Sequence, residues 1–315
     1  MTDEVLYNRL SVFEKEHLIR LDQKVSAPSP QWEGKILPFT KGFDFMDNRP
    51  IGVFDSGLGG LTAVRELRRI LPGEDIIFFG DTGRVPYGSR SPHIIKEYAK
   101  QCMDFLEKQD VKMILVACGT VSSVLGENMN EGRKVPCMGV LESTVKAAVS
   151  ATKNKNIGLI ATAATVASGS YEKLTAEIMP EAKFTGKACP LFVPLVENGY
   201  FAASCEVTRL VAKDYLSAFD GKDIDTLILG CTHYPLLYNL IDSVTEHKLN
   251  LIDSGKEAAL GAKALLEEKD MLSGMKKIGG MKFFVTDKEE GFAMLGKEFL
   301  GEELSDVTRL EIEEL

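Results

Sequence analysis

From residue 51 onward, short apolar runs alternate with longer charged segments whose apolar residues recur at helical spacing. The runs are IGVF (51–54), DIIFFG (75–80), KMILVA (112–117), CMGVL (137–141), IGLIA (157–161), DTLILG (225–230) and LNLID (249–253). Strands that are apolar along their whole length are buried on both faces, which is typical of a parallel sheet covered by helices. The pattern therefore predicts a doubly wound α/β protein.

Two local similarities indicate an internal duplication. The segment IGVFDSGLGGLTAVREL, beginning at residue 51, has the same strand, small-residue turn and helix form as IGLIATAATVASGSYEKL, beginning at residue 157. Likewise, ILVACGT ends a strand at Cys118 and LILGCTH ends one at Cys231, at nearly the same spacing. Ligands of open α/β sheets bind beyond the carboxyl ends of the strands, so two facing units would bring both cysteines to one cleft.

The length of 315 residues suits two domains and an extension. We expect residues 149–257 to form the second α/β domain, and residues 49–148 and 258–315 the first, because a helical stretch and a short strand follow the second unit. Residues 1–48 carry apolar residues at roughly helical spacing and then a proline-containing segment, which predicts a helix and an irregular arm. This arm would pack on the body or on a second subunit, or would have a regulatory role.

The charge, hydropathy and cysteine content of the chain limit which partners and which cellular compartment we expect. The chain has 37 Lys and Arg against 46 Asp and Glu, a net charge of −9, which argues against a nucleic-acid partner. No stretch is long and apolar enough to span a membrane, and the first residues lack the pattern of a secretory signal. We therefore expect a cytoplasmic protein with no membrane partner. Its six cysteines would be thiols, and no pair is spaced for a metal or redox motif.

Cys118 and Cys231 are the candidate catalytic residues. Each follows an apolar strand at the start of a loop, where nearby amide donors favour a thiolate. Two acid–base groups facing one carbon suit racemisation, in which a proton leaves one face and another arrives on the opposite face. Two alternatives stay open: both are buried packing thiols, or Cys231 is the nucleophile of a cysteine hydrolase whose base is His233.

Two loops near the strand ends favour a compact acidic ligand. The DSGLGG segment (55–60) departs from dinucleotide-binding patterns. We therefore expect its small residues to allow close approach of a ligand to the backbone, with Asp55 and Ser56 pointing toward that ligand. Asp55 could instead be a helix N-cap. The loop GDTGRVPYGSRS (80–91) contains a turn at Tyr87 and Gly88 whose backbone amides could hold a carboxylate.

Several of these segments, in order and spacing, resemble the glutamate racemases of the aspartate/glutamate racemase family. They are IGVFDSGLGGLTAVRELRRILPGEDIIFFGDTGRVPYGSRS, VACGTVSSV, ACPLFVPLVENG, DTLILGCTHYPLL and LIDSG. The resemblance covers roughly residues 51–310. It implies two α/β domains related by pseudo-twofold symmetry, an active site in the cleft between them, and racemisation of glutamate with neither pyridoxal phosphate nor a metal. It also implies a homodimer that supplies D-glutamate for peptidoglycan.

The resemblance also assigns roles to single positions. Cys118 would act on the D-glutamate side, assisted by Asp55, and Cys231 on the L-glutamate side, assisted by His233, with Glu197 as a further acidic group. The positions that would hold the ammonium and carboxylates of the substrate are Asp55, Ser56, Tyr87, Gly88, Gly119, Thr120, Thr165, Thr232 and His233.

One position departs from the family pattern. Members of the family usually have Asn where this chain has Gly119, and the loss of an amide that contacts the substrate would cost on the order of 1 to 3 kcal/mol unless other groups replace its hydrogen bonds. Substrate choice is therefore open to a second reading, in which the substrate is aspartate or another acidic amino acid. A third reading is a non-catalytic relative that binds such a ligand.

Overall fold

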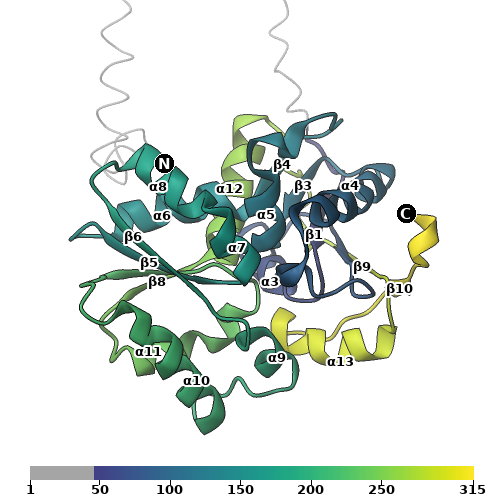
Figure 1. The fold of residues 1–315 in the computed structure, drawn as a ribbon. Helices are drawn as coiled ribbons and strands as arrows, with labels where there is room; N and C mark the ends of the chain where they lie inside the picture. Colours follow the sequence, from purple (N-terminus) through teal and green to yellow (C-terminus); the bar gives the residue numbers. More distant parts are fainter. Residues whose placement is uncertain (1–45) are drawn as a thin grey trace, which may run out of the picture. The chain divides into compact units, whose positions relative to one another are not determined.

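The computed structural model describes residues 46–315, so the predicted N-terminal helix and arm lie outside it apart from residues 46–48. The described residues form two parallel β-sheets with helices on both faces, as the sequence predicts (Figure 1). Among them, no helix is long and apolar enough to cross a membrane.

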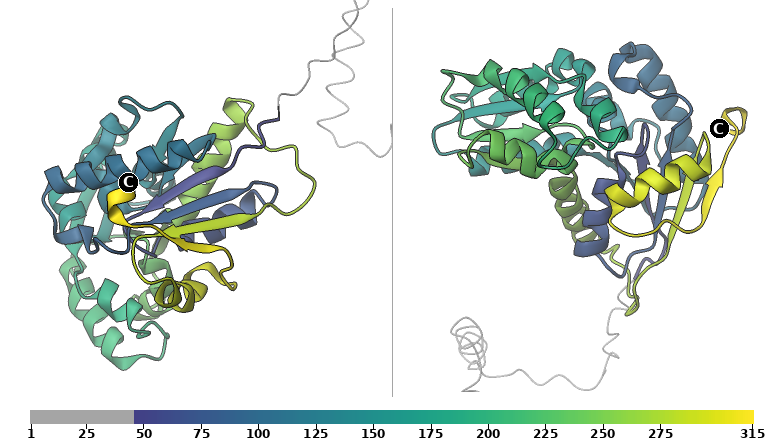
Figure 2. Two further views of the ribbon diagram at one scale, coloured as in Figure 1. Left: turned by 90° about the vertical axis from the view of Figure 1, so that its right-hand side faces the viewer. Right: turned by 90° about the horizontal axis from the view of Figure 1, so that it is seen from below.

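The larger sheet has six strands in the order β10-β9-β2-β1-β3-β4, and all neighbouring strands are parallel. Its strands are β1 (Ile51–Asp55), β2 (Ile76–Gly80), β3 (Met113–Val116), β4 (Cys137–Gly139), β9 (Met281–Val285) and β10 (Val307–Arg309). The last two strands return from the C-terminal part of the chain, and β9 pairs with β2 (Figure 2).

The smaller sheet has four parallel strands in the order β6-β5-β7-β8. They are β5 (Asn156–Ala161), β6 (Lys183–Ala188), β7 (Thr226–Leu229) and β8 (Asn250–Asp253). This order repeats the order β2-β1-β3-β4 of the larger sheet strand by strand. The duplication read from the sequence is therefore present in the topology, with β5 corresponding to β1 and β7 to β3.

All seven apolar runs of the sequence form strands, whereas strands β6 and β10 are not marked by an apolar run. Strand β6 is the edge of its sheet and its residues are exposed or half-buried, so its sequence KFTGKA is largely polar. Strand β10 is a short edge strand with the sequence VTR. Edge strands have fewer buried neighbours than central ones, so apolar character is a poor guide to them.

Helices cover each sheet on both sides. The helices are α3 (Leu61–Ile70), α4 (Pro92–Lys108), α5 (Gly119–Leu125), α6 (Val140–Ala151), α7 (Ala163–Ser168), α8 (Ser170–Ile178), α9 (Phe192–Glu197), α10 (Glu206–Leu216), α11 (Tyr238–Val244), α12 (Ser254–Glu268) and α13 (Glu289–Leu300). Helices α4 and α5 bury one face of the larger sheet, and α3 and α13 bury the other. Helices α6 and α8 cover one face of the smaller sheet, and α9, α10 and α11 the other.

One buried apolar cluster extends from the larger sheet to the smaller one. It contains Val53 and Leu115 of the first, Leu227 and Leu229 of the second, and Ala258 of α12. Helix α12 packs on both α3 and α6. The strands within residues 49–148 and 258–315 form one sheet and those within 149–257 the other. The division into two domains at these boundaries, which fall within α6 and α12, stays a prediction.

Candidate active site

Cys118 and Cys231 occupy equivalent places in the two sheets. Cys118 lies two residues beyond the end of β3 and is the N-cap residue of α5. Cys231 lies two residues beyond the end of β7, just before the short 3-10 helix η4 (Tyr234–Leu237). Their exposed fractions are only 5% and 7%. Both thiols lie at the carboxyl ends of corresponding strands, as the duplication in the sequence predicts, but they are buried rather than partly exposed.

The backbone beside one cysteine lies against the backbone beside the other. Gly119 is so close to Gly230 that a Cβ atom at residue 119 would collide with the carbonyl oxygen of Gly230. A second such contact joins Gly59, in the turn after β1, to the side chains of Thr232 and His233. The hydroxyl of Thr62 also donates to the carbonyl oxygen of Thr232 at 3.0 Å. The turns of the two sheets are thus brought together around the thiols.

Cys118 is held in an environment that favours the neutral thiol. Burial raises its pKa to about 12, and the negative charge of Asp55 adds to the rise. The sulfur lies 3.3 Å from the hydroxyl of Ser56, and a hydrogen bond from that hydroxyl to the thiolate opposes the shift. Cys118 therefore rests as the neutral thiol, so the thiolate expected from the amide donors at this strand end is wrong for Cys118, because burial outweighs those donors.

Asp55, the last residue of β1, is fully buried beside this thiol. Its Oδ2 accepts the backbone N–H of Gly57 at 2.9 Å, whereas its Oδ1 has no hydrogen-bond partner among residues 46–315. Burial raises the pKa of Asp55, although the Gly57 hydrogen bond and the charge of His233 oppose the rise. An unpartnered carboxylate oxygen in the interior is costly, which suits a group that meets a ligand or a proton.

Cys231 has a different neighbour, the imidazole of His233. The Nδ1 atom of His233 lies 3.9 Å from the Cys231 sulfur, and its Nε2 atom lies 2.9 Å from Oε1 of Glu197, at the end of α9. Burial works against the charged ring, but the interactions with Cys231 and Glu197 prevail and raise the pKa of His233 to about 10. A positive imidazolium beside a sulfur stabilises its thiolate. The two thiols therefore differ in electrostatic environment.

Three threonine hydroxyls from the two sheets form a cluster. Thr120, from the first turn of α5, lies 2.9 Å from Thr162, whose hydroxyl lies 2.9 Å from that of Thr165. The Oγ1 atoms of Thr165 and Thr120 are 3.5 Å apart. Sequence analysis selected Thr120 and Thr165 but missed Thr162, the N-cap residue of α7. The internal repeat could have identified Thr162 as a site residue, because Thr162 follows strand β5 as Ser56 follows β1.

The turn at Tyr87 and Gly88, in the 3-10 helix η1 (Tyr87–Ser89), also reaches the other sheet. A Cβ atom at Gly88 would be 3.0 Å from the Cβ atom of Thr162. The side chain of Tyr87 is buried and its hydroxyl donates to Asp81. A ligand in this region would therefore meet the backbone of the turn rather than the phenol.

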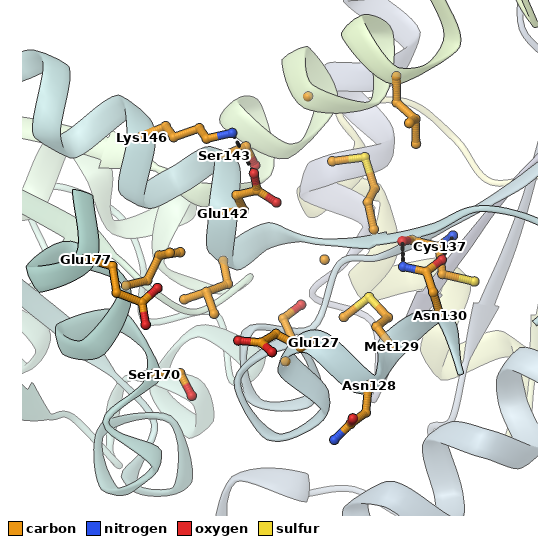
Figure 3. A pocket seen from close by; sticks show the side chains of 18 of the residues that line it. Glu127, Asn128, Met129, Asn130, Cys137, Glu142, Ser143, Lys146, Ser170 and Glu177 are labelled. Carbon is orange, nitrogen blue, oxygen red and sulfur yellow. Dashed lines mark hydrogen bonds and ion pairs between the residues drawn. The ribbon is translucent and has the colours of Figure 1, made fainter. Parts of the chain in front are cut away.

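A separate cavity of about 830 Å³ lies elsewhere in the described structure (Figure 3). It is lined by residues from α5, the 3-10 helix η2 (Gly126–Asn130), β4, α6, α8 and α12. Its charged residues include Glu127, Glu142, Lys146 and Glu177. None of the site residues predicted from the sequence lines this cavity, so it is distinct from the region between the two thiols.

Known proteins resemble this chain over most of its length. A sequence model described as Asp/Glu/Hydantoin racemase matches residues 51–262. The glutamate racemase of Geobacter metallireducens is 40% identical over 265 residues, which span 84% of this chain and 97% of that protein. The glutamate racemase of Chlorobaculum tepidum is 44% identical over 265 residues, covering 82% and 94%.

A solved structure has the same fold. The crystal structure of glutamate racemase from Francisella tularensis, in complex with D-glutamate, aligns with a TM-score of 0.79 at 38% sequence identity. The alignment covers 86% of this chain and 100% of the other. The curated relatives and this structure are matched over nearly their whole length, so the similarity includes both sheets.

Proposed function

Because the chain belongs to the Asp/Glu/Hydantoin racemase family, we propose that it interconverts L-glutamate and D-glutamate with two thiols and no cofactor. The observation that supports this most strongly is the pair of buried thiols, Cys118 and Cys231, at corresponding strand ends whose adjoining backbones are in contact. A hydrolase would need only one nucleophile with one base. Two cysteines in duplicated positions suit a reaction that treats two faces of one carbon alike.

In the direction from L-glutamate to D-glutamate, Cys231 is the base. The imidazolium of His233 stabilises its thiolate, which takes the α-hydrogen as a proton and leaves the electron pair of the C–H bond on Cα. The neutral Cys118 thiol then donates its proton to the opposite face of Cα. The product is the other enantiomer, with Cys231 as the thiol and Cys118 as the thiolate.

In the reverse direction the roles exchange, so Cys118 must first lose its proton. The carboxylate of Asp55 is buried beside this thiol and has one free oxygen among the described residues. We assign Asp55 as the group that assists Cys118, and His233, oriented by Glu197, as the group that assists Cys231.

Formation of the carbanion on Cα is the energetically most demanding step, because the new negative charge lies next to a negative carboxylate. Hydroxyl and amide donors held in place before the reaction stabilise such a charge best. We assign this role to the threonine cluster of Thr120, Thr162 and Thr165. We assign the binding of a substrate carboxylate to the backbone of the turn at Tyr87 and Gly88. Ser56 and Thr232, which flank the two thiols, complete the substrate-binding set.

The wider role follows the resemblance to glutamate racemases. It makes the protein a cytoplasmic homodimer whose product, D-glutamate, supplies peptidoglycan synthesis. The second candidate substrate is aspartate, and the observation that favours it is Gly119, which lacks the side chain that the family pattern has at this position.

The test is racemisation by the purified full chain. L-glutamate, D-glutamate and both enantiomers of aspartate are incubated with protein that has been dialysed against a chelator, without pyridoxal phosphate, and optical rotation is followed. In parallel, exchange of the α-hydrogen is measured in deuterium oxide. We expect both enantiomers of glutamate to reach the same mixture. Faster racemisation of aspartate than of glutamate would favour the second candidate. Absence of α-hydrogen exchange with every acidic amino acid would contradict the proposed activity and indicate a non-catalytic binding protein.

A further inference from the structure

A buried cluster centred on Asp81 joins three segments of the larger sheet. Asp81 follows β2 and is fully buried. Its Oδ2 accepts the Nε–H of Arg84 at 2.6 Å and the hydroxyl of Tyr87, and its Oδ1 accepts the hydroxyl of Thr286 at 2.9 Å. Its backbone N–H donates to the carbonyl oxygen of Asp55 at 3.1 Å. The carboxylate of Asp81 therefore connects the loop after β2 with the end of β9, and its backbone N–H connects that loop with the end of β1.

The other members of the cluster are also partnered, so its geometry is closely determined. Arg84 donates to Oε1 of Gln101 at 2.5 Å, and its guanidinium lies 4.1 Å from the centre of the Tyr98 ring. Thr286 accepts the backbone N–H of Gly83 at 2.8 Å while donating to Asp81. A buried carboxylate paired with an arginine and further donors is strongly ordered, because each unmade bond would leave an unpaired polar group.

The cluster ends at the turn that faces the second sheet. Tyr87, whose phenol is bound by Asp81, is followed directly by Gly88, which lies against Thr162. The phenol points into the protein, so it acts on a ligand only through the backbone of its own turn. Thr286 lies beyond residues 51–262, which the family model matches.

We propose that Asp81, through Tyr87 and Thr286, is the positioning centre of the turn at Tyr87 and Gly88, and thereby determines how tightly a substrate carboxylate is held there. This rests on the proposed function. Without the phenol hydrogen bond the turn would sample other positions, and its amides would have to be ordered when the substrate binds. Affinity then falls more than the rate of the bound complex.

Two variants test this, each removing one hydroxyl of the cluster. In Tyr87→Phe and in Thr286→Val we expect KM for glutamate to rise about tenfold, the equivalent of one hydrogen bond to a charged group, with kcat changed less than about threefold. The matched control is Tyr98→Phe, because the ring of Tyr98, rather than its hydroxyl, contacts Tyr87 and Arg84. This control should keep the wild-type KM.

Hydrogen–deuterium exchange supplies a readout that does not depend on turnover. Both variants should increase exchange at the amides of residues 82–90 relative to wild type, and Tyr98→Phe should not. Unchanged exchange in Tyr87→Phe, or a lower melting temperature with unchanged KM, would overturn the positioning role. A wild-type protein that lacks glutamate turnover would refute the proposed function instead, and the exchange measurement would still decide whether Asp81 orders the turn.

Discussion

The Nε2 atom of His233 lies 2.9 Å from the Oε1 atom of Glu197. The other ring nitrogen lies 3.9 Å from the Cys231 sulfur, so the carboxylate orients the ring toward the thiol. Together the two interactions raise the pKa of His233 to about 10 although the ring is buried. Glu197 thus makes a charged imidazolium possible in the interior.

We expect Glu197→Gln to reduce stability most at neutral and mildly acidic pH. In the wild type, His233 has a folded-state pKa of about 10 against an ordinary value of 6.5. Its contribution to the free energy of unfolding is therefore complete below about pH 6.5 and is lost as the pH rises toward 10. Gln lowers the folded-state pKa, so the difference between wild type and variant should shrink as the pH rises.

Urea denaturation of both proteins at several pH values between 6 and 10 measures this difference. Ionisation of buried thiols such as Cys118, whose pKa is also raised, weakens both proteins at alkaline pH and cancels in the comparison. A difference that stays constant over the whole range would show that Glu197 does not hold a proton on His233.

Replacing either thiol should stop inversion but leave exchange on one face. Cys118→Ser and Cys231→Ser should each lower racemisation by about 10²- to 10⁴-fold, because each removes one of the two acid–base groups. Cys118→Ser keeps the base for L-glutamate, so deuterium should still enter L-glutamate faster than D-glutamate. Cys231→Ser should show the opposite preference. Proton NMR in deuterium oxide follows both.

The control for this pair is Cys205→Ser, since Cys205 is half-exposed at the start of α10 and far less enclosed than the two buried thiols. It should keep wild-type racemisation. Equal exchange into both enantiomers by Cys118→Ser would contradict the assignment of one thiol to each face.

A side chain at residue 119 should force the two thiol-bearing loops apart. Its Cβ atom would collide with the carbonyl oxygen of Gly230, and backbone does not move aside as a flexible side chain does. We expect Gly119→Ala and Gly119→Asn to lose about 1–3 kcal/mol of stability, as overpacked sites do. We also expect kcat/KM for glutamate to fall at least about tenfold, because small errors in alignment are costly to catalysis.

Gly291→Ala is the matched control for these variants, because this helical glycine has open space around its Cβ position. It should be neutral or stabilising by up to about 1 kcal/mol. Thermal unfolding and racemisation rates of the three proteins are compared. Higher glutamate turnover in Gly119→Asn would show that the loops separate easily and that the missing amide limits the enzyme.

Thr162→Val should weaken substrate binding, because it removes the central hydroxyl of the threonine cluster while keeping the side-chain volume. We expect kcat/KM for glutamate to fall about tenfold, because the cluster stabilises the carbanion as well as the bound substrate. Stability should fall by about 1 kcal/mol, since Thr162 also accepts the backbone N–H of Thr165 as an N-cap. Thr162→Ser retains the hydroxyl and should restore both properties, and failure of this rescue would point to the methyl group instead.

The pattern of residue types was enough to predict the α/β architecture and the approximate place of the site. Apolar runs mark strands because a strand buried on both faces contains few polar residues, and this is a local property of the chain. The duplicated strand ends identified Cys118 and Cys231 as a pair. Thr162 occupies the same place in the second unit as Ser56 in the first, but only Ser56 was predicted as a site residue. The sequence did not predict the edge strands β6 and β10, because strands with few buried neighbours do not need apolar residues.

The groups that surround the thiols at contact distance could not be read from the sequence, because they come from distant parts of the chain. Gly119 meets Gly230, and Asp81 meets Thr286, although each pair is far apart along the chain. Such contacts depend on how whole helices and sheets pack, and no local pattern of residue types records them. The same holds for protonation, since the neutral thiol of Cys118 and the charged ring of His233 arise from burial and from partners that folding brings together.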